Sequence, residues 1–312
     1  MPPRPAKPPH VRRFPASVLL ATRWRKFVTS AQGRAGRIGA AAIAALASRL
    51  TERDRLVALA CYEHRVLTTE QLRRLHFGSS RRAAQRLAEL YELRVLDRFR
   101  PPRQPNEGSA PYHWLLDEAG AHIAAEALGV ERSELRWRRQ GAIAIAGSAK
   151  LGHQLEVNEF FTRLADEARL GGGRLAEWWG ERRCLAALDG QAAPDGYGKL
   201  LLPGRPPVSF LLELDRSTED HGRLRQKARR YQKALPRSIL ADAQPLLLIA
   251  VPSSARRDNA AAQLAGSSLP LRVCVWTPEL SPLATLRDAT DDFHTHTDNR
   301  SSDLAPLPAP DD

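Results

Sequence analysis

Three acidic side chains fall in two neighbouring apolar segments of the sequence. Glu213 and Asp215 lie two residues apart in "VSFLLELD", so on a strand they point to the same side of a sheet. Asp195 belongs to the preceding segment, and a turn at Pro203-Gly204 is expected to fold the two segments back against each other. The three carboxylates are therefore predicted to converge at one point.

Converging carboxylates repel one another unless a cation or a proton separates them. An oxygen-rich site of this kind suits Mg²⁺ or Mn²⁺, which makes Asp195, Glu213 and Asp215 candidate metal ligands. A divalent ion there activates water and stabilises the transition state of phosphodiester cleavage. A helix expected over "LGHQLEVNEFF" places His153 and Glu156 along one stripe, three residues apart, as accessory candidates.

Helices and strands alternate along the sequence around these acids. After residue 150 the pattern predicts a helix, three strands, a helix, a strand, a helix and a strand, which is an α/β core. The strands in "PLLLIAV" and "LRVCVWT" are apolar throughout, as expected of strands covered on both faces. Residues 151–280 are predicted to form a mixed sheet flanked by helices, and residues 281–312 a disordered acidic tail.

A different pattern occupies residues 51–130. Three short helices are expected first, the second in "VLTTEQLRRLHFG" and the third in "SSRRAAQRLAELYELRVL". A strand at Val95–Phe99, a turn-rich loop and a returning strand at Tyr112–Leu116 follow. Three helices and a β-hairpin in this order predict a winged helix-turn-helix, so the chain as a whole is expected to be α+β.

In a winged helix the third helix enters the major groove of DNA and the hairpin tip lies against a phosphate backbone. We expect this helix to bury Ala84, Leu87, Leu90 and Tyr91. The alternatives are that its arginines form only a solvated face, or that the domain binds another protein. The candidate DNA-contacting side chains are Arg81, Arg82, Gln85, Arg86, Arg100 and Arg103.

The positive charge is concentrated at the front of the chain. The formal net charge is +12, and residues 1–50 hold ten Lys or Arg and no acid, whereas residues 151–312 hold twenty against twenty-two acids. Such charge is the usual footprint of a phosphate-backbone partner, so double-stranded DNA is the expected partner. Residues 1–50 are predicted to be a basic arm with an Ala-rich helix, and residues 131–150 a basic linker.

Composition disfavours several other classes of protein. Cys61, Cys184 and Cys274 are far apart in apolar segments, which is typical of reduced cysteines in a cytoplasmic protein. No apolar stretch reaches the roughly 20 residues of a membrane span, so no membrane partner is expected. The basic "RWRK" of the arm interrupts any export signal. The chain also has no Walker A sequence, which argues against nucleotide-driven work.

The "PDG" at Pro194–Gly196, followed after a strand by "ELD", resembles the motif of the PD-(D/E)XK nuclease superfamily. The resemblance implies a metal-dependent DNA endonuclease in which the Asp and the Glu bind metal and a lysine two residues after the Glu assists the attacking water. Here Asp215 occupies the position of that lysine. Lys227, in the following helix, is the predicted replacement, and Lys199 is the other candidate.

Together with the winged helix, "HQLEVNEFF", "LELDRSTE" and "KxxxY" at Lys227–Tyr231 make the chain similar to the replication-relaxation family of actinobacterial plasmids and integrative elements. The similarity covers roughly Thr51–Trp276. It implies a DNA-binding protein of plasmid or mobile-element replication or relaxation, acting with other replication or conjugation proteins.

Two interpretations of the second domain stay open. In one it is an active nuclease that uses Asp195, Glu213, Asp215 and Lys227. In the other the chain is a transcriptional or copy-number regulator with an inactive nuclease fold. Asp215-Arg216 then form a surface pair, Asp195-Gly196 turn the chain, and Ser217 with Asp220 cap the next helix. The sequence leaves the oligomeric state open.

Overall fold

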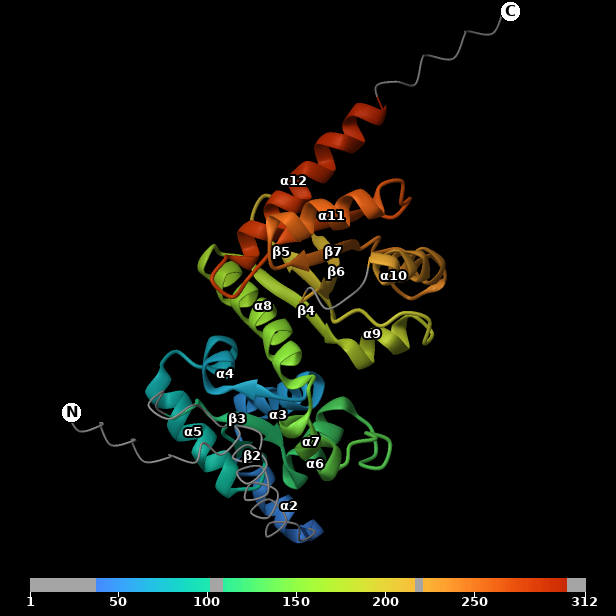
Figure 1. Ribbon diagram of the computed structural model, residues 1–312. Helices are drawn as coiled ribbons and strands as arrows, with labels where there is room; N and C mark the ends of the chain where they lie inside the picture. Colours follow the sequence, from blue (N-terminus) through green and yellow to red (C-terminus); the bar gives the residue numbers. More distant parts are fainter. Residues whose placement is uncertain (1–37, 102–108, 217–220, 302–312) are drawn as a thin grey trace, which may run out of the picture.

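The computed structural model describes residues 38–101, 109–216 and 221–301 of the 312-residue chain. Within these ranges the protein is a mixed α+β structure with eleven α-helices and two β-sheets (Figure 1). We call residues 38–150 the first unit and residues 151–301 the second unit. Most of the basic arm, Arg103 on the predicted hairpin, and the predicted cap of Ser217 with Asp220 lie outside the described residues.

Four helices of the first unit, α3 to α6, begin at polar side chains that accept from their free backbone amides. Thr51 and Thr68 each form a capping box, with Asp54 and Gln71 respectively. Its three strands are antiparallel, in the order β1-β3-β2. The elements are α2 (Ala40–Ala47), α3 (Glu52–His64), β1 (Leu67–Thr68), α4 (Thr69–His76), α5 (Ser80–Glu92), β2 (Leu96–Phe99), β3 (His113–Leu116), α6 (Glu118–Leu128), α7 (Arg139–Ala144) and the 3₁₀ turn η1 (Ile145–Gly147).

The buried face of α5 differs by one position from the predicted face. Ala83, Leu87 and Leu90 are buried, whereas Ala84 is exposed and Tyr91 is half-buried. Positions 83, 87 and 90 follow the 3.6-residue period, and a neighbouring position lies about 100° around the helix. The prediction for Ala84 was wrong because alanine occupies both positions and carries no signal of its own.

Residues 131–150 are folded and do not form the predicted linker. Ile145 is buried in a small apolar cluster. Arg139 Nη2 donates to Asp97 Oδ2 at 2.6 Å and Arg139 Nε donates to Asp117 Oδ1 at 2.7 Å. Both carboxylates are buried and require a cation there, which fixes this segment against the first unit.

A five-stranded sheet of order β4-β5-β6-β7-β8 forms the second unit, with β4, β5 and β6 antiparallel and β6, β7 and β8 parallel. Helices α8 and α12 pack on one face, and α9, α10 and α11 on the other. The elements are α8 (Leu151–Leu170), β4 (Arg174–Gly180), α9 (Glu181–Ala187), β5 (Gly196–Leu201), β6 (Val208–Leu214), α10 (His221–Ala234), η2 (Leu235–Arg237), β7 (Leu246–Val251), α11 (Ser254–Leu264), β8 (Leu271–Val275) and α12 (Pro282–Ser301).

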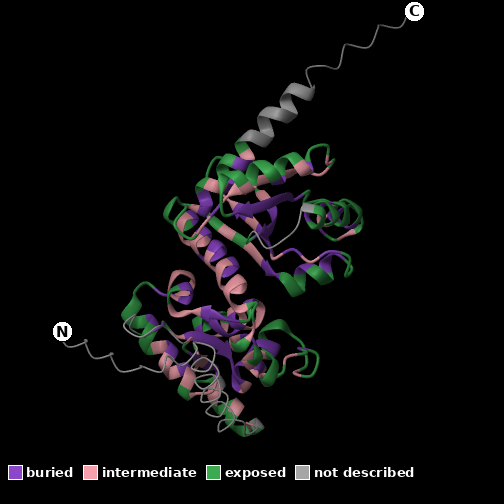
Figure 2. Ribbon diagram, in the orientation of Figure 1, coloured by how far each residue is buried: buried purple, intermediate pink, exposed green. Residues whose placement is uncertain are grey.

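The central strands carry the core, as Figure 2 shows in purple. Every residue of β7 is buried, as its apolar sequence predicted, whereas β8 is half-buried along its length. The predicted tail is wrong over α12, because Leu283, Leu286 and Ala289 are buried against the sheet. Their spacing of three residues makes one apolar stripe, and the acidic Asp288 lies outside it.

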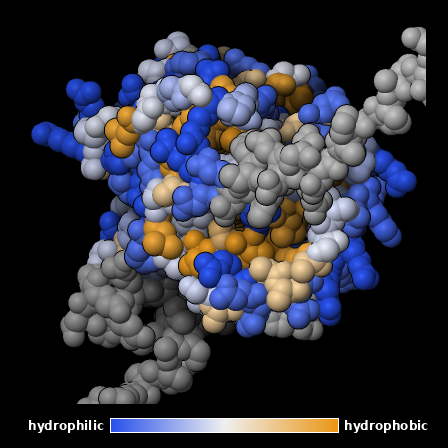
Figure 3. All heavy atoms as spheres, turned by 90° about the horizontal axis from the view of Figure 1, so that it is seen from above, coloured by the Kyte–Doolittle hydropathy of each residue, from blue (hydrophilic) through white to orange (hydrophobic). Residues whose placement is uncertain are grey.

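In the view of Figure 3, hydrophobic side chains gather near the centre and hydrophilic ones surround them. No helix within the described ranges is long and apolar enough to cross a membrane.

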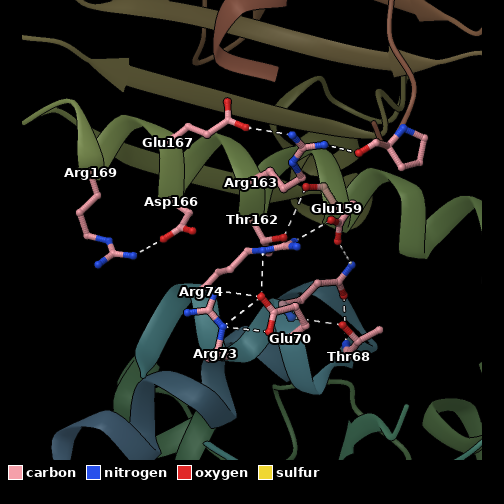
Figure 4. A network of polar contacts seen from close by, with 12 residues as sticks. Thr68, Glu70, Arg73, Arg74, Glu159, Thr162, Arg163, Asp166, Glu167 and Arg169 are labelled. Atoms are coloured by element: carbon pink, nitrogen blue, oxygen red, sulfur yellow. Dashed lines mark hydrogen bonds and ion pairs between the residues drawn. The ribbon is translucent and has the colours of Figure 1, made fainter. Parts of the chain in front are cut away.

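Helix α8 joins the two units. Gln71 Nε2 of α4 donates to Leu155 O and to Glu159 Oε2 of α8, both at 3.1 Å. Arg74 Nη1 forms an ion pair with Glu159 Oε1 at 2.6 Å, part of the α4–α8 network in Figure 4. Because these contacts are partly buried, α4 and α8 form a continuous packed interface.

A second contact between the units involves aromatic rings. His64, at the end of α3, stacks on Trp178 of β4 with ring centroids 3.4 Å apart. The His64 ring is buried, and burial lowers the pKa of His64 to about 3, with His76 adding to the effect. This imidazole is therefore neutral and packs as an aromatic side chain.

Candidate functional site

Asp195 is fixed between the ends of two antiparallel strands. It lies directly before β5, and its backbone N–H donates to Leu212 O of β6 at 3.0 Å. The Leu214 N–H donates in turn to Asp195 Oδ2 at 2.8 Å. The predicted hairpin between these strands is present, and it brings Asp195 beside Glu213.

Gly196 does not form the turn expected of Asp195-Gly196. It is the first residue of β5, and a Cβ there would lie 2.6 Å from the Phe161 ring of α8. A Cβ at Gly198 would lie 2.5 Å from the Phe210 ring of β6 and 3.0 Å from the Phe161 ring. The glycines of "PDGYG" therefore let α8 pack tightly on the sheet and bring its side chains to the site.

The other oxygen of Asp195 contacts His153. His153 Nε2 of α8 lies 2.7 Å from Asp195 Oδ1. This hydrogen bond raises the pKa of His153 above its ordinary value, and partial burial opposes it. A protonated imidazolium is thus favoured here, with its carboxylate partner directly behind it.

Glu213 is buried near the C-terminal end of β6 and is contacted twice from α10. Lys227 Nζ donates to Glu213 Oε2 at 2.9 Å, and the Tyr231 hydroxyl donates to Glu213 Oε1. Lys227 and Tyr231 are four residues apart, so both lie on one face of α10. Burial, followed by the charge of Asp195, raises the pKa of Glu213 to about 7, against the opposing effects of Lys227 and Tyr231.

Asp215 is bound by a different cation. Its Oδ2 accepts from Arg256 Nε at 2.8 Å and lies 2.7 Å from Arg256 Nη2 of α11. Arg216 does not pair with Asp215 as one interpretation predicted; its Nε lies 3.2 Å from Glu156 Oε2. Asp215 therefore lines the same pocket as Asp195, but Arg256 of α11 binds its carboxylate.

Lys199 also lies away from the group. Its Nζ is 3.9 Å from Glu177 Oε1 on the neighbouring strand β4. Lys227 is thus the lysine that the structure brings to Glu213. Its 2.9 Å contact spans fourteen residues of sequence.

A metal requires free oxygens, and here they are engaged. Asp195 and Glu213 supply the carboxylates that Mg²⁺ prefers. Their oxygens accept from His153, Lys227, Tyr231 and a backbone amide. In the part of the chain that the structure describes, no group of three or more His, Cys, Asp or Glu side chains is placed to hold a metal ion. This arrangement does not fit the predicted three-carboxylate metal site.

A pocket of about 400 Å³ opens above Asp195 and Lys227. Its other cationic lining residues are Arg65, Lys150 and Arg216, so positive side chains surround the acidic floor. A Cβ at position 152 would lie 3.1 Å from Arg216 Nη1, and glycine there leaves room for the guanidinium. A pocket of this size and charge suits a phosphate-bearing group.

The predicted DNA-contacting residues of α5 separate into two sets. Arg81 and Arg82 are exposed at its start and form no side-chain hydrogen bond or ion pair within the described ranges. Arg86 instead bonds to the buried Asp54, with distances of 2.9 and 2.6 Å, and to Glu89. Arg86 therefore holds α5 against α3, and it is not available as a free cation.

Gln85 and Arg100 each contact a neighbouring side chain. Gln85 Nε2 makes a long contact of 3.4 Å with Glu89. Arg100, after β2, lies over the Tyr112 ring at 3.8 Å, and Arg98 lies 4.3 Å from the same ring. The Tyr112 ring thus holds both guanidinium groups at the base of the hairpin.

Two residues of the site were not predicted. Tyr231 was noted only as part of the "KxxxY" pattern, although its four-residue spacing from Lys227 signals a shared helix face. Arg256 gave no signal, because it lies 41 residues from Asp215 and only the parallel crossover brings it close.

Comparison with known proteins gives one positive result. Searches of the curated proteins and of the solved structures found no significant match. The family model described as "Replication-relaxation" matches residues 60–240, more than half of the chain. The matched span contains Asp195, Glu213 and Lys227, as well as α4 and α5. The chain therefore belongs to the replication-relaxation family.

Proposed function

We propose that this protein binds double-stranded DNA during the replication or relaxation of a plasmid or another mobile element, and that the first unit acts as a winged helix. Family membership supports the biological role. The order of three helices followed by the antiparallel pair β2–β3 supports the DNA-binding role. The second unit then acts on the bound DNA, as a nuclease-like domain.

The start of α5 is the proposed DNA contact. Arg81 and Arg82 lie in the first turn, where the free backbone amides and the helix dipole add attraction for a phosphate. Arg100 at the hairpin base supplies a further cation, held by Tyr112. These residues account for positioning on the phosphate backbone, whereas base contacts carry sequence specificity.

The contact between Lys227 Nζ and Glu213 Oε2, at 2.9 Å, carries the proposal for the second unit. Asp215 stands where the nuclease motif has its lysine, and Lys227 reaches the same carboxylate from α10. Lys227 and His153 both line the pocket, each with a carboxylate behind it. Two cationic donors held in this way bind a phosphodiester and stabilise the negative charge that develops on its oxygens during cleavage.

Nicking of supercoiled plasmid tests this proposal. Lys227→Met and Asp195→Asn are expected to abolish nicking, whereas Lys199→Met retains it because Lys199 pairs with Glu177 away from the pocket. The assay needs arms with Mg²⁺, Mn²⁺ and EDTA, because an ion at Asp195 and Glu213 must replace contacts from His153 and Lys227. Nicking that survives both pocket variants would contradict the assignment.

A specific observation favours the second candidate, a regulator with an inactive nuclease-like domain. Arg256 binds Asp215 in a buried ion pair, and protein donors already satisfy Asp195 and Glu213. A purified protein that binds duplex DNA but does not nick plasmid in any metal arm supports this candidate.

A further inference from the structure

A second pocket adjoins the first, in the space between the two units. It has a volume of about 540 Å³, against about 400 Å³ for the pocket above Asp195. Arg65, Gln154 and Glu181 line both pockets, so the two form one continuous groove. We call this the interdomain groove. Its lining comes from α3, α7, α8, α9 and the segments between them.

Several exposed cations line the groove. In the described ranges, four of its basic side chains are exposed and make no hydrogen bond, ion pair or ring contact: Arg65, Arg136, Arg138 and Lys150. The acids are mostly engaged, since Glu63 accepts from the Gly180 amide at 2.8 Å and Asp215 binds Arg256. Glu181 is exposed at the junction. The groove therefore has an excess of free positive charge.

Arg65 is held in the groove by a strained turn. Its φ is 67° and its ψ is −49°, a conformation that is costly for a residue with a side chain. The buried Asn158 of α8 donates to the carbonyls on both sides, His64 O at 3.3 Å and Val66 O at 2.5 Å. Arg136 also has a positive φ, of 50°. Two lining arginines thus share an unusual backbone geometry.

An aromatic side chain lies among these cations. Trp137 is half-buried between Arg136 and Arg138 and lines the larger pocket. Arg132 lies 5.0 Å from the centroid of its ring and donates to the Trp137 carbonyl at 3.4 Å. A positively charged groove that contains an aromatic ring is the usual design for single-stranded nucleic acid, because phosphates follow the charge and bases stack on the ring.

We propose that the interdomain groove binds single-stranded DNA and leads it to the pocket above Asp195. Arg65, Arg136, Arg138 and Lys150 contact successive phosphates, and Trp137 stacks on a base. The inference rests on the proposed function, since unwound DNA arises when the duplex held by the first unit opens. Pockets of these volumes can enclose one or two nucleotides of a single strand. A duplex presents two strands at once and therefore fits them less well.

Fluorescence anisotropy with a labelled single-stranded DNA of about eight nucleotides tests the proposal, a length within the range that such sites bind. The double variant Arg136→Gln with Arg138→Gln is expected to lose about tenfold in affinity. The slope of log affinity against log salt should also fall by about 1.4, because each lost phosphate contact on a single strand removes about 0.7. The control, Arg237→Gln with Arg287→Gln, removes the same charge at exposed residues that line neither pocket.

The variant Trp137→Leu tests the contribution of base stacking to binding separately from that of ionic contacts. We expect weaker binding of the single strand with an unchanged salt slope, because the indole contributes no ionic contact. A single-stranded RNA of the same sequence and free inorganic phosphate serve as competitors. Equal competition by inorganic phosphate at matched phosphate concentration would overturn the proposal in favour of a simple anion site.

Duplex binding, measured with the same proteins, distinguishes failure of this inference from failure of the proposed function. If the wild type binds duplex but not single strand, or if the groove double variant binds single strand as the wild type does, the groove proposal is wrong and the duplex proposal stands. If single-strand binding depends on the groove while duplex binding is absent, the groove proposal stands and the winged-helix proposal is wrong.

Discussion

Two clusters of buried acids and bases, one in each unit, use their cations differently. In the first unit Arg139 bridges Asp97 and Asp117, and its side chain is only 12% exposed. In the second unit Lys227 and His153 contact Glu213 and Asp195, and their side chains are 36% and 33% exposed. The acids are largely buried in both clusters. The difference lies in the cation, which is enclosed in the structural cluster and open to a pocket in the candidate site.

The exposure of the cation distinguishes an ion pair that only stabilises the fold from one that can also contact a ligand. An enclosed cation between two carboxylates has no surface left for a ligand, and its removal leaves uncompensated buried charge. A cation at a pocket wall keeps donor hydrogens for a second anion. Both clusters have short ion pairs, and the exposure of the cation shows which of them is accessible to a ligand.

The largest effect is expected from Arg139→Met. Asp97 and Asp117 then lose their short ion pairs with Arg139, while Arg94 Nε stays 3.6 Å from Asp117 Oδ2. Because both carboxylates are buried, this costs about 3–5 kcal/mol of unfolding free energy. Chemical denaturation followed by circular dichroism measures it. A loss below about 1 kcal/mol would show that the two clusters do not differ as described.

Loss of an uncharged, buried hydrogen-bond donor should lower the unfolding free energy by an intermediate amount. Asn158→Leu removes the donor to His64 O and Val66 O and releases the strained turn at Arg65. The lost hydrogen bonds and the unsatisfied carbonyls cost about 2–3 kcal/mol. Denaturation measures the loss, and Asn158→Asp, which keeps the size but not the donor, should lose at least as much. Unchanged stability would show that the carbonyls find other partners.

Acid should weaken the interface between the units through His64. Its pKa is lowered to about 3, so the stability due to the neutral ring is present above pH 6.5 and is lost as the pH falls below that value. Between pH 7 and pH 5 the loss amounts to about 2 kcal/mol. His64→Phe keeps a ring against Trp178 and should remove that part of the pH dependence, whereas the part due to His76, with a pKa lowered to about 4, remains. An identical pH profile in wild type and variant would contradict this.

The smallest change in stability is expected from Lys227→Met. The lysine is partly exposed and solvent screens its ion pair, so the unfolding free energy should fall by about 1 kcal/mol or less. Lys227→Arg, which keeps the charge, is the matched control. A loss as large as that of Arg139→Met would place Lys227 among structural cations and remove the contrast between the clusters.

Local patterns predicted much of the candidate site. The two-residue alternation and the turn at Pro203-Gly204 brought Asp195 beside Glu213, because both signals act within one hairpin. The sequence named Lys227 as a candidate partner because it lies in the helix after Glu213, and the contact of 2.9 Å comes from the packing of α10 on the sheet. The family assignment was confirmed as well.

Long-range packing explains what the sequence did not predict. Asp215 was assigned to the acidic cluster, but its partner Arg256 follows another strand and helix. Arg86 was assigned to DNA, although Asp54, 32 residues earlier, binds it. In each case a charged side chain has several possible partners in the sequence, and only the packed structure selects one.

Helix α8 sets the distance between the first unit and the pocket. His153 at its start reaches the pocket, and Glu159, six residues later, holds Arg74 of α4. At 1.5 Å per residue these two anchor points are about 9 Å apart along a single rod. Both anchor points belong to one helix, so the spacing between α4 and the pocket is fixed. If the first unit holds a duplex as proposed, this spacing determines which phosphate comes closest to Lys227.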